Sequence, residues 1–322
     1  VGRCPWHDDK TPSLVITPEK NLWHCMGACQ IGGSVFDWVM KAYNISFRHA
    51  YEILKSGDIP SSPARTATNH RTRVLPPVLD LTADDQVLIK QVIAYYHQTL
   101  KESAEGLAYL KSRGITSPDV IQRYQIGFAN RTLGLRVPPR SQSGGAEIRN
   151  RLNRIGILRK TGHDRYNGSI VIPVFDEAGD VREIYGRKIT VGLREGTPDH
   201  MYLPEHANRG VFNVEALARY PEIILCEALI DALTFLNAGF PNVTTAYGVN
   251  GFTAEHRAAF ERYKTKRVLI AYDRDEAGEK AAASLACELM ASGIECFRVQ
   301  FPHGMDANEY ALKVIPAAKS LG

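Results

Sequence analysis

The apolar residues of the chain follow three patterns, with one polar stretch between the first and the second. In the first 57 residues, Val35, Trp38, Val39 and Ala42 recur at helical spacing and predict one helix over 34–55. Residues 58–80 are rich in Pro, Ser and charged side chains and show no apolar period, which is typical of a linker. The pattern therefore predicts a compact unit at 1–57 and a linker at 58–80.

Helices and then a hairpin follow in the middle of the chain. Residues 82–85 have the composition of a helix start, and further helices are predicted at 104–113 and from Ser117-Pro118 onward. The apolar run 169–175, the turn at 176–180 and the return over 181–185 predict two paired strands. We expect a mixed α+β lobe over 81–213.

Strands and helices alternate in the last hundred residues. Strands are predicted at 223–226, 243–247, 268–272 and 295–301, and helices at 229–236, 253–263 and 278–292. Such alternation predicts a parallel sheet with helices on both faces, as in Rossmann-like domains. The expected fold class is α/β, with this sheet domain over 214–322.

Composition and charge place the chain among globular proteins with a basic segment. Its 322 residues are 44% hydrophobic and 23% charged, which is ordinary for two or three folded domains. The net charge is only +4, but basic residues concentrate in one stretch: Arg136, Arg140, Arg149, Arg151, Arg154, Arg159, Lys160 and Arg165. This excess indicates either a surface that faces nucleic-acid phosphates or a solvated flexible face.

The chain has no recognisable secretory signal and no apolar run long enough to span a bilayer, so we expect a cytoplasmic protein without a membrane partner. Cys226, Cys287 and Cys296 lie in apolar stretches and are expected to be small buried hydrophobes. The chain begins at Val1, which favours a trimmed chain or a fragment.

A set of Cys and His residues near the N-terminus predicts a metal site. Cys4 and His7 form one close pair, and Cys25 and Cys29 form a second. These are the ligands that tetrahedral zinc prefers, and four protein ligands leave no open position, so the zinc is expected to be structural. His24 is a competing ligand. The Trp residues of this unit are expected to build its core, with stacking on unpaired bases as the alternative.

Acidic residues after two predicted strands indicate a second metal site. Glu227 follows the strand at 223–226, and Asp273 and Asp275 follow the strand at 268–272. The carboxyl ends of parallel strands line one crevice, so these carboxylates should meet there, and their repulsion favours a divalent cation, Mg²⁺ or Mn²⁺. Asp231 and Asp306 are expected to add carboxylates. Such a site supports nucleotidyl transfer.

Several motifs resemble those of one family, the bacterial DnaG-type DNA primases. Cys226-Glu227-Ala228-Leu229-Ile230-Asp231 and Tyr272-Asp273-Arg274-Asp275-Glu276-Ala277-Gly278 resemble the two motifs of the Toprim domain. Cys4-Pro5-Trp6-His7, Lys10-Thr11-Pro12-Ser13 and His24-Cys25 resemble the CHC2 zinc-binding domain. Segments 108–115, 124–129, 172–176 and 186–188 resemble the N-terminal lobe of the primase core. The likeness covers almost the whole chain and also fits a phage or mobile-element primase.

The resemblance implies domains and roles by position. It implies a CHC2-type domain at 1–57, the N-terminal lobe of the polymerase core at 81–213 and a catalytic Toprim domain at 214–322. The residues implied to hold the catalytic metals are Glu227, Asp273 and Asp275, with Asp231 and Asp306 in support. The residues implied to bind nucleotide or template are Arg187, Lys188 and Arg209.

The chain departs from the family pattern at several positions. Met201 stands where a Lys is expected, and Lys188 or His200 are the nearest substitutes for its charge. Ala228 replaces a Gly, and Asn308 replaces a second late acid after Asp306. One extra residue lies between the last two zinc ligands. These departures bear most on the binding of the triphosphate.

The activity implied by the resemblance is synthesis of short RNA primers from nucleoside triphosphates on a single-stranded DNA template. A replicative helicase would be supplied by another chain or by a missing domain. Two alternatives remain open from the residues alone. A Toprim nuclease or topoisomerase-like enzyme would cleave DNA without added nucleotides, and an inactive nucleic-acid-binding module would bind template without incorporation.

Overall fold

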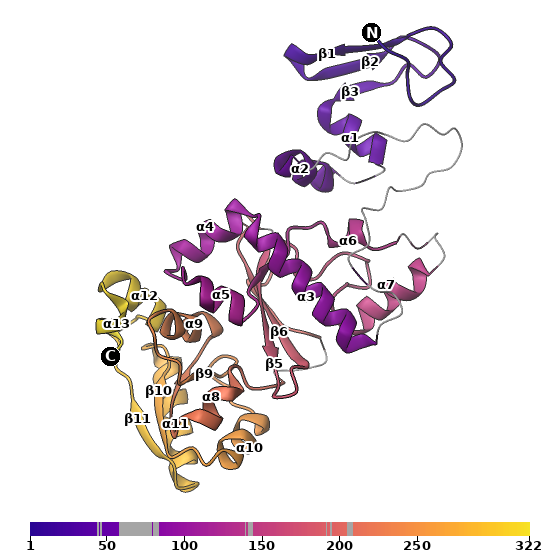
Figure 1. Cartoon of the computed structure of the whole chain (residues 1–322). Helices are drawn as coiled ribbons and strands as arrows, with labels where there is room; N and C mark the ends of the chain where they lie inside the picture. Colours follow the sequence, from indigo (N-terminus) through magenta and orange to yellow (C-terminus); the bar gives the residue numbers. More distant parts are fainter. Residues whose placement is uncertain are drawn as a thin grey trace. The chain divides into compact units, whose positions relative to one another are not determined.

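A computed structural model describes residues 1–43, 45, 47–57, 79, 84–138, 140, 144–190, 192–193, 195–204 and 209–322 (Figure 1). Contacts divide the chain into two compact units, Val1–Leu79 with Asn130–Asn150, and Asp80–Ala129 with Arg151–Gly322. The linker expected at 58–80 lies outside the described residues except for Leu79. Residues 130–150 make their contacts with the first unit, so the borders expected at 57, 80 and 213 stay predictions.

The first unit begins with a three-stranded antiparallel sheet, in the order β1 (Leu14–Thr17), β2 (Leu22–Cys25) and β3 (Gly32–Ser34). A short 3₁₀ helix, Pro18–Lys20, joins β1 to β2. Two helices follow, α1 (Val35–Tyr43) and α2 (Phe47–Ser56). The single helix predicted over 34–55 is therefore wrong. The chain leaves the helical path near Ile45, and the two shorter helices bury Val39 and Ile53 in one shared core.

A later part of the chain completes the first unit. Leu135, in the short helix α6 (Leu133–Arg136), packs into the core of α1 and α2. Arg131 is almost fully buried and makes an ion pair of 2.6 Å with Glu52 of α2. Helix α7 (Gly145–Arg154) begins in this unit and ends in the second.

The second unit starts with three helices, α3 (Asp85–Lys101), α4 (Ala104–Ser112) and α5 (Pro118–Arg123). Asp84, Ser103 and Ser117 cap them by accepting hydrogen bonds from backbone N–H groups, which confirms the helix starts predicted at 104 and at Ser117-Pro118 and places the start predicted within 82–85 at Asp84. Residues 82 and 83 lie outside the described residues. These helices cover an antiparallel sheet in the order β4 (Gly127–Phe128), β5 (Ser169–Phe175), β6 (Val181–Lys188) and β7 (His200–Met201).

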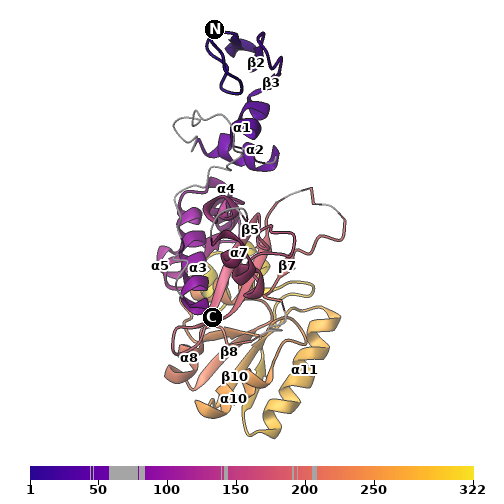
Figure 2. The same cartoon turned by 90° about the vertical axis from the view of Figure 1, so that its right-hand side faces the viewer.

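The C-terminal sheet of the second unit is parallel, as predicted. Its strands run in the order β11 (Glu295–Arg298), β10 (Arg267–Ala271), β8 (Glu222–Cys226) and β9 (Val243–Thr245). The helices of this region are α8 (Val214–Arg219), α9 (Leu229–Asn237), α10 (Ala254–Arg262), α11 (Glu276–Ala291), α12 (Ala307–Lys313) and α13 (Ala317–Ser320). Figure 2 shows the length of α11 beside the sheet.

Alternate side chains of β8 face two different cores. Ile224 and Cys226 pack with α9, whereas Ile223 and Leu225 pack with α8, α10 and α11. This alternation confirms that helices cover both faces of the sheet. Cys287, on α11, is exposed and not buried as predicted, whereas Cys226 is fully buried.

Several arginines of the basic segment serve the fold itself. Arg149 donates to the backbone oxygens of Gly134, Val137 and Pro138. Arg151 and Arg154 form ion pairs with Asp85 at 3.1 and 2.7 Å. The segment is therefore less open to phosphates than its composition predicts. Among the described residues, no helix is long and apolar enough to cross a membrane.

Candidate functional site

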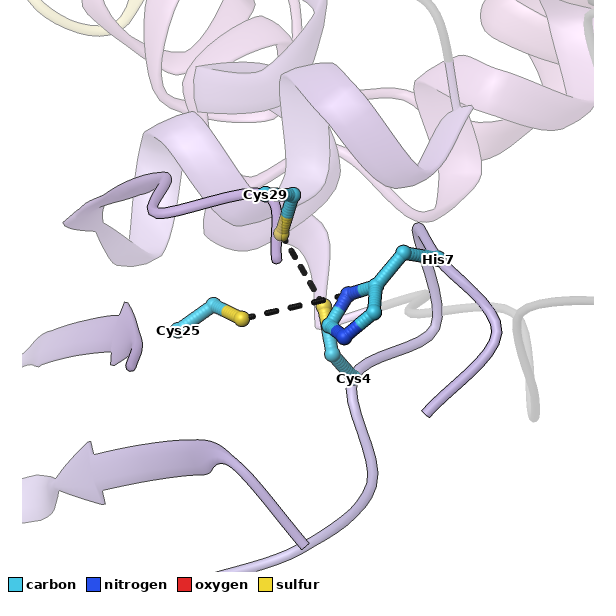
Figure 3. Close-up of side chains that lie close together, drawn as sticks. All are labelled: Cys4, His7, Cys25 and Cys29. Atoms are coloured by element: carbon cyan, nitrogen blue, oxygen red, sulfur yellow. Dashed lines mark hydrogen bonds between the residues drawn. The ribbon is translucent and has the colours of Figure 1, made fainter. Parts of the chain in front are cut away.

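The Cys and His residues of the first unit meet in space as the sequence predicts. The ligand atoms of Cys4, His7, Cys25 and Cys29 all lie within 4.8 Å of one another (Figure 3). Cys4 and His7 precede β1, Cys25 ends β2, and Cys29 lies in the loop before β3. His24 is exposed on the opposite face of β2 from Cys25, which rules it out as the fourth ligand in this arrangement.

The surroundings of the cluster favour the thiolate of Cys25, whereas burial raises the pKa of the Cys4 thiol. Burial opposes ionisation of Cys25, but the polar groups around its Sγ, among them the Gly27 N–H that donates to it at 3.3 Å, outweigh burial and lower the pKa of this thiol to about 6. Three thiols and one imidazole at this spacing fit a tetrahedral zinc ion with no open position. The extra residue between Cys25 and Cys29 does not prevent their convergence.

The tryptophans of the first unit pack on one another. The ring centroids of Trp6 lie 4.7 Å from Trp23 and 4.6 Å from Trp38, and Trp23 and Trp38 are 5.2 Å apart. Trp23 is buried in the same small core as Cys4 and Cys25. The expectation that these residues build the core is therefore confirmed, and stacking on bases is not needed to explain them.

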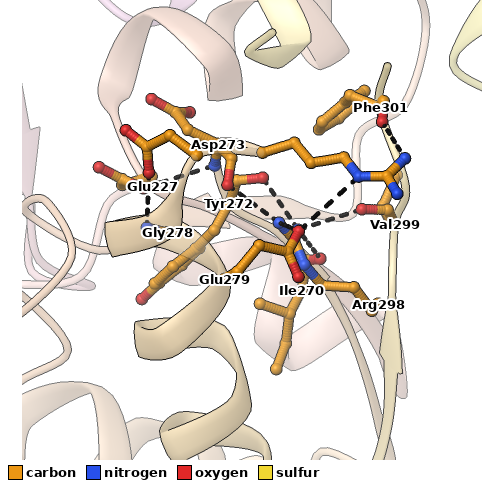
Figure 4. Close-up of polar contacts among 11 residues, drawn as sticks. Glu227, Ile270, Tyr272, Asp273, Gly278, Glu279, Arg298, Val299 and Phe301 are labelled. Atoms are coloured by element: carbon orange, nitrogen blue, oxygen red, sulfur yellow. Dashed lines mark hydrogen bonds and ion pairs between the residues drawn. The ribbon is translucent and has the colours of Figure 1, made fainter. Parts of the chain in front are cut away.

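The acidic residues of the second unit gather at the carboxyl edge of the parallel sheet. Glu227 follows β8 and Asp273 follows β10, the neighbouring strand, and the backbone N–H of Asp273 donates to Glu227 Oε2 at 3.4 Å (Figure 4). Asp231 lies in the first turn of α9 and is almost fully buried. Asp275 and Asp306 cap the starts of α11 and α12.

Burial and mutual repulsion make it unfavourable to ionise the carboxyl groups at this edge when no cation is bound. Burial raises the pKa of Asp273 to about 7, and the charge of Glu227 adds to the shift. Burial also raises the pKa of Glu227. It raises the pKa of Asp231 as well, and the negative charge of Asp306 is the second cause of that shift. Asp273 Oδ1 is buried and has no hydrogen-bond partner among the described residues. An unpartnered carboxylate oxygen of this kind fits a divalent cation.

The acidic edge is more open than the zinc site. Among the described residues, the carboxylates do not form a set that could hold one ion as the Cys and His residues do. Mg²⁺ commonly binds through one or two carboxylates, several waters and substrate phosphates. The spacing of the carboxylates therefore fits a cation whose coordination shell is completed by water and substrate phosphates.

Local contacts fix the loop that carries Asp273 and Asp275. Gly278 N–H donates to Asp275 Oδ1 at 2.7 Å, and a Cβ atom on Gly278 would lie only 2.2 Å from the backbone oxygen of Asp273. Arg298 of β11 donates to the backbone oxygens of Tyr272 and Asp273 at 2.9 and 3.0 Å. The sequence interpretation missed Arg298, although this residue lies in the strand predicted at 295–301.

Two departures from the family pattern are compatible with the fold. Ala228 has an extended backbone, with φ −122° and ψ 158°, so no glycine is needed there. The buried amide of Asn308 donates to the backbone oxygen of Arg113 at 2.7 Å and to Thr234 Oγ1 at 2.8 Å. A carboxylate at 308 could not donate to the Arg113 oxygen, so the amide suits its neighbours.

The three basic residues expected near the nucleotide are not equivalent. Arg187 contacts His200 Nε2 across the β6–β7 pair, and His200 Nδ1 lies 2.8 Å from the Tyr185 hydroxyl. Burial, with the Arg187 charge second, lowers the pKa of His200. Lys188 lies on the opposite face of β6, where its Nζ donates to the backbone oxygen of Asn167.

Arg209 and Met201 complete the picture of this region. Arg209 lines a cavity of about 280 Å³ together with Arg154 and Arg182. Met201 is buried opposite Gly186, where the expected Lys would stand. Neither expected substitute replaces the missing Lys: Lys188 lies on the other face of β6, and burial lowers the pKa of His200, so its ring is uncharged near neutral pH.

Three family models match the chain in succession. They are a CHC2 zinc finger over residues 1–66, the N-terminal domain of the DNA primase catalytic core over 95–205, and a Toprim-like domain over 224–311. Fold and sites together define a zinc-finger protein with a metal-dependent Toprim domain: the finger holds structural zinc and the Toprim domain binds Mg²⁺. In these three successive domains the chain is similar to the DnaG-type DNA primases.

Individual relatives agree with this assignment. The chain is 29% identical to the DNA primase of Staphylococcus epidermidis, over 97% of this chain and 53% of that protein. The zinc-binding and RNA polymerase domains of Aquifex aeolicus primase match with a TM-score of 0.62 and 25% identity, over 98% of this chain and 76% of that one. A DnaG primase catalytic domain bound to ssDNA matches with a TM-score of 0.56 and 25% identity, over 71% and 76%. The chain spans about half the length of the curated relatives it matches.

Proposed function

We propose that this chain carries the primer-synthesising part of a DNA primase, which joins nucleoside triphosphates into short RNA primers on a single-stranded DNA template. The observation that carries the proposal is the gathering of Glu227, Asp273 and Asp275 at one sheet edge, in a chain that also has the zinc finger and the primase-core lobe. The relatives named DNA primase support the same activity.

Each acidic residue has a role that its position supports. Glu227, Asp273 and Asp275 would ligate the catalytic Mg²⁺ or Mn²⁺, which when bound activates the primer hydroxyl and neutralises the triphosphate. Asp231 would tune the charge of the site from its buried position on α9. Asp306 would do so from the start of α12. Arg298 would hold the loop of Asp273 in place through backbone oxygens.

The basic residues would orient the nucleotide and the template. Arg187 is the best placed of them because His200, which the Tyr185 hydroxyl holds in turn, contacts its side chain. Arg209 would contact phosphates from the rim of its cavity. Lys188 would support the nucleotide site indirectly by holding the loop of Asn167, since its ammonium group donates to the Asn167 backbone oxygen. These contacts predict template binding that weakens as salt rises.

The domain division and the partners are part of the same proposal. We infer a zinc-binding domain at 1–57, a linker at 58–80, a polymerase lobe at 81–213 and a catalytic Toprim domain at 214–322. Cys4, His7, Cys25 and Cys29 would hold a structural zinc. The single-stranded DNA seen with the related catalytic domain supports such a template here. A replicative helicase would come from another chain or domain, and the work would take place in the cytoplasm.

Incorporation of labelled nucleotides on single-stranded templates of varied sequence tests the proposal. We expect Mg²⁺-dependent products that disappear in Asp275→Ala, while Glu261→Gln, which changes an exposed acid on α10, stays active. Cleavage of the template without added nucleotides would instead identify a Toprim nuclease. Template binding with no incorporation in Mg²⁺ or Mn²⁺ would identify an inactive binding module.

A further inference from the structure

The carboxylate of Asp9 lies against the zinc cluster without being one of its ligands. Asp9 Oδ2 accepts hydrogen bonds from the backbone N–H of Cys4 at 2.6 Å and from Ser13 Oγ at 2.8 Å. Its other oxygen, Oδ1, lies 3.5 Å from His7 Nε2. The Asp9 side chain is only 5% exposed, so these contacts are largely shielded from solvent.

The orientation of the His7 ring follows from these positions. His7 Nδ1 lies 3.9 Å from Cys25 Sγ, on the cluster side, and Nε2 lies toward Asp9. A histidine that gives one nitrogen to a metal keeps a proton on the other, and a carboxylate near that nitrogen fixes the ring and makes it a better ligand. Asp9 is therefore placed to hold the His7 ring with Nδ1 toward the cluster.

Ser13 extends the contact to the second pair of ligands. Ser13 Oγ donates to Asp9 and lies 3.4 Å from Cys25 Sγ. Gly27 packs directly against Ser13, because a Cβ atom at this position would lie only 2.6 Å from Ser13 Oγ. Its N–H group donates to Cys25 Sγ at 3.3 Å. Asp9 and Ser13 thus connect Cys4 and His7 on one side with Cys25 on the other.

We propose that Asp9 is the positioning residue of the zinc centre, which orients His7 directly and links the two ligand pairs through Ser13. The inference rests on zinc ligation by the Cys and His residues named above. The neighbouring acid, Asp8, is exposed, so proximity in sequence does not give it the same role. Changes to such supporting groups commonly weaken metal affinity by about 10–100-fold.

Zinc affinity of the full chain tests the proposal, measured by competition with a chromophoric chelator. We expect about 10–100-fold weaker zinc binding in Asp9→Asn, and no change in the matched control Asp8→Asn. Cobalt loaded in place of zinc gives a second readout. Its visible absorption bands should shift in Asp9→Asn, because the His7 ring is no longer held, and should be unaltered in Asp8→Asn.

A double-mutant cycle separates the bridge from a general loss of structure. Under the proposal, Asp9→Ala and Ser13→Ala each remove the Asp9–Ser13 link, so the double variant loses less zinc affinity than the sum of the two single losses. Fluorescence of the Trp cluster at saturating zinc reports whether each variant regains its fold. Additive effects, or an Asp9→Asn affinity equal to that of Asp8→Asn, would overturn the proposal. Cys25→Ser tests the ligand assignment separately, because it should lose zinc whether or not Asp9 matters.

Discussion

The two metal sites of this chain are built in opposite ways. At the zinc site, the ligand atoms lie within 4.8 Å of one another, and nearby N–H groups already have partners: Gly27 N–H donates to Cys25 Sγ and Cys4 N–H donates to Asp9. At the acidic edge, the carboxylates are held by different elements, and one buried oxygen of Asp273 has no hydrogen-bond partner among the described residues. The first site is complete from the protein alone, whereas the second needs ions and substrate to be complete.

This contrast follows from what each site must do. A structural ion stabilises a unit too small to bury much apolar surface, so all four ligands come from the chain and none is free to exchange. A catalytic cation must accept substrate phosphates, so the protein leaves positions open and tolerates like charges in the ion-free state. Loss of a ligand should therefore damage folding at the zinc site and activity at the acidic edge.

Loss of a zinc ligand should give the largest effect on folding. Structural zinc contributes roughly 10–16 kcal/mol of apparent folding free energy in small zinc units, so Cys25→Ser should unfold the zinc unit. All three Trp residues of the chain lie in this unit, so their fluorescence reports its folding without interference from the second unit. Cys287→Ser, at an exposed cysteine of α11, is the control and should leave the fluorescence unchanged. A native-like Trp signal in Cys25→Ser would break the comparison.

Loss of an acidic ligand should reduce activity without unfolding the chain. Asp273→Asn removes a buried charge that the ion-free fold tolerates poorly, so the melting temperature without metal should stay the same or rise. Nucleotide incorporation should fall by about 100-fold or more, because a metal contact to the reacting phosphates is worth several kcal/mol. Calorimetry and a primer-synthesis assay measure the two effects. A marked loss of stability in Asp273→Asn would show that the acids are structural.

The sequence predicted both sites for a simple physical reason. Metal ligands must be of particular types, and strand ends fall where apolar runs end, so the sequence alone places Glu227 and Asp273 at the sheet edge. The sequence interpretation grouped Lys188 with Arg187 as nucleotide-binding residues. Consecutive strand residues point to opposite faces of a sheet, so this rule already separates the two side chains. The same rule of alternation separates His24 from Cys25.

The parts that the sequence did not predict depend on contacts between distant residues. The segment between α1 and α2 contains no glycine or proline that would mark a break in the sequence. The two helices instead bring Val39 and Ile53, fourteen residues apart, into one core. The arginines of the basic segment find partners such as Asp85, which lies more than sixty residues away in the chain. The role of Asn308 likewise depends on Arg113, from a different helix region.

A further acid at the sheet edge should destabilise the fold moderately. Asn308→Asp replaces a buried amide that donates to the Arg113 oxygen, and it adds a charge near Asp231. Leaving a buried oxygen without its donor costs about 1–3 kcal/mol, so the free energy of unfolding should fall by that amount. Asn237→Asp is the matched control, because Asn237 Oδ1 accepts from the N–H groups of Thr116 and Ser117 and an aspartate can do the same. Denaturant unfolding of both variants measures the difference.

The acidic edge should also respond to pH in a way that the closed zinc site does not. The pKa of Asp273 is raised to about 7 in the fold, so the ion-free protein loses stability as pH rises toward that value from the ordinary range of an aspartate. Mg²⁺ must displace the remaining proton, and the ionised fraction grows from about one tenth at pH 6 to about nine tenths at pH 8. The rise in melting temperature on adding Mg²⁺ should therefore be larger at pH 8 than at pH 6. Asp273→Asn should remove most of this dependence, and a rise of equal size at both pH values would show that protons and Mg²⁺ do not compete at this carboxylate.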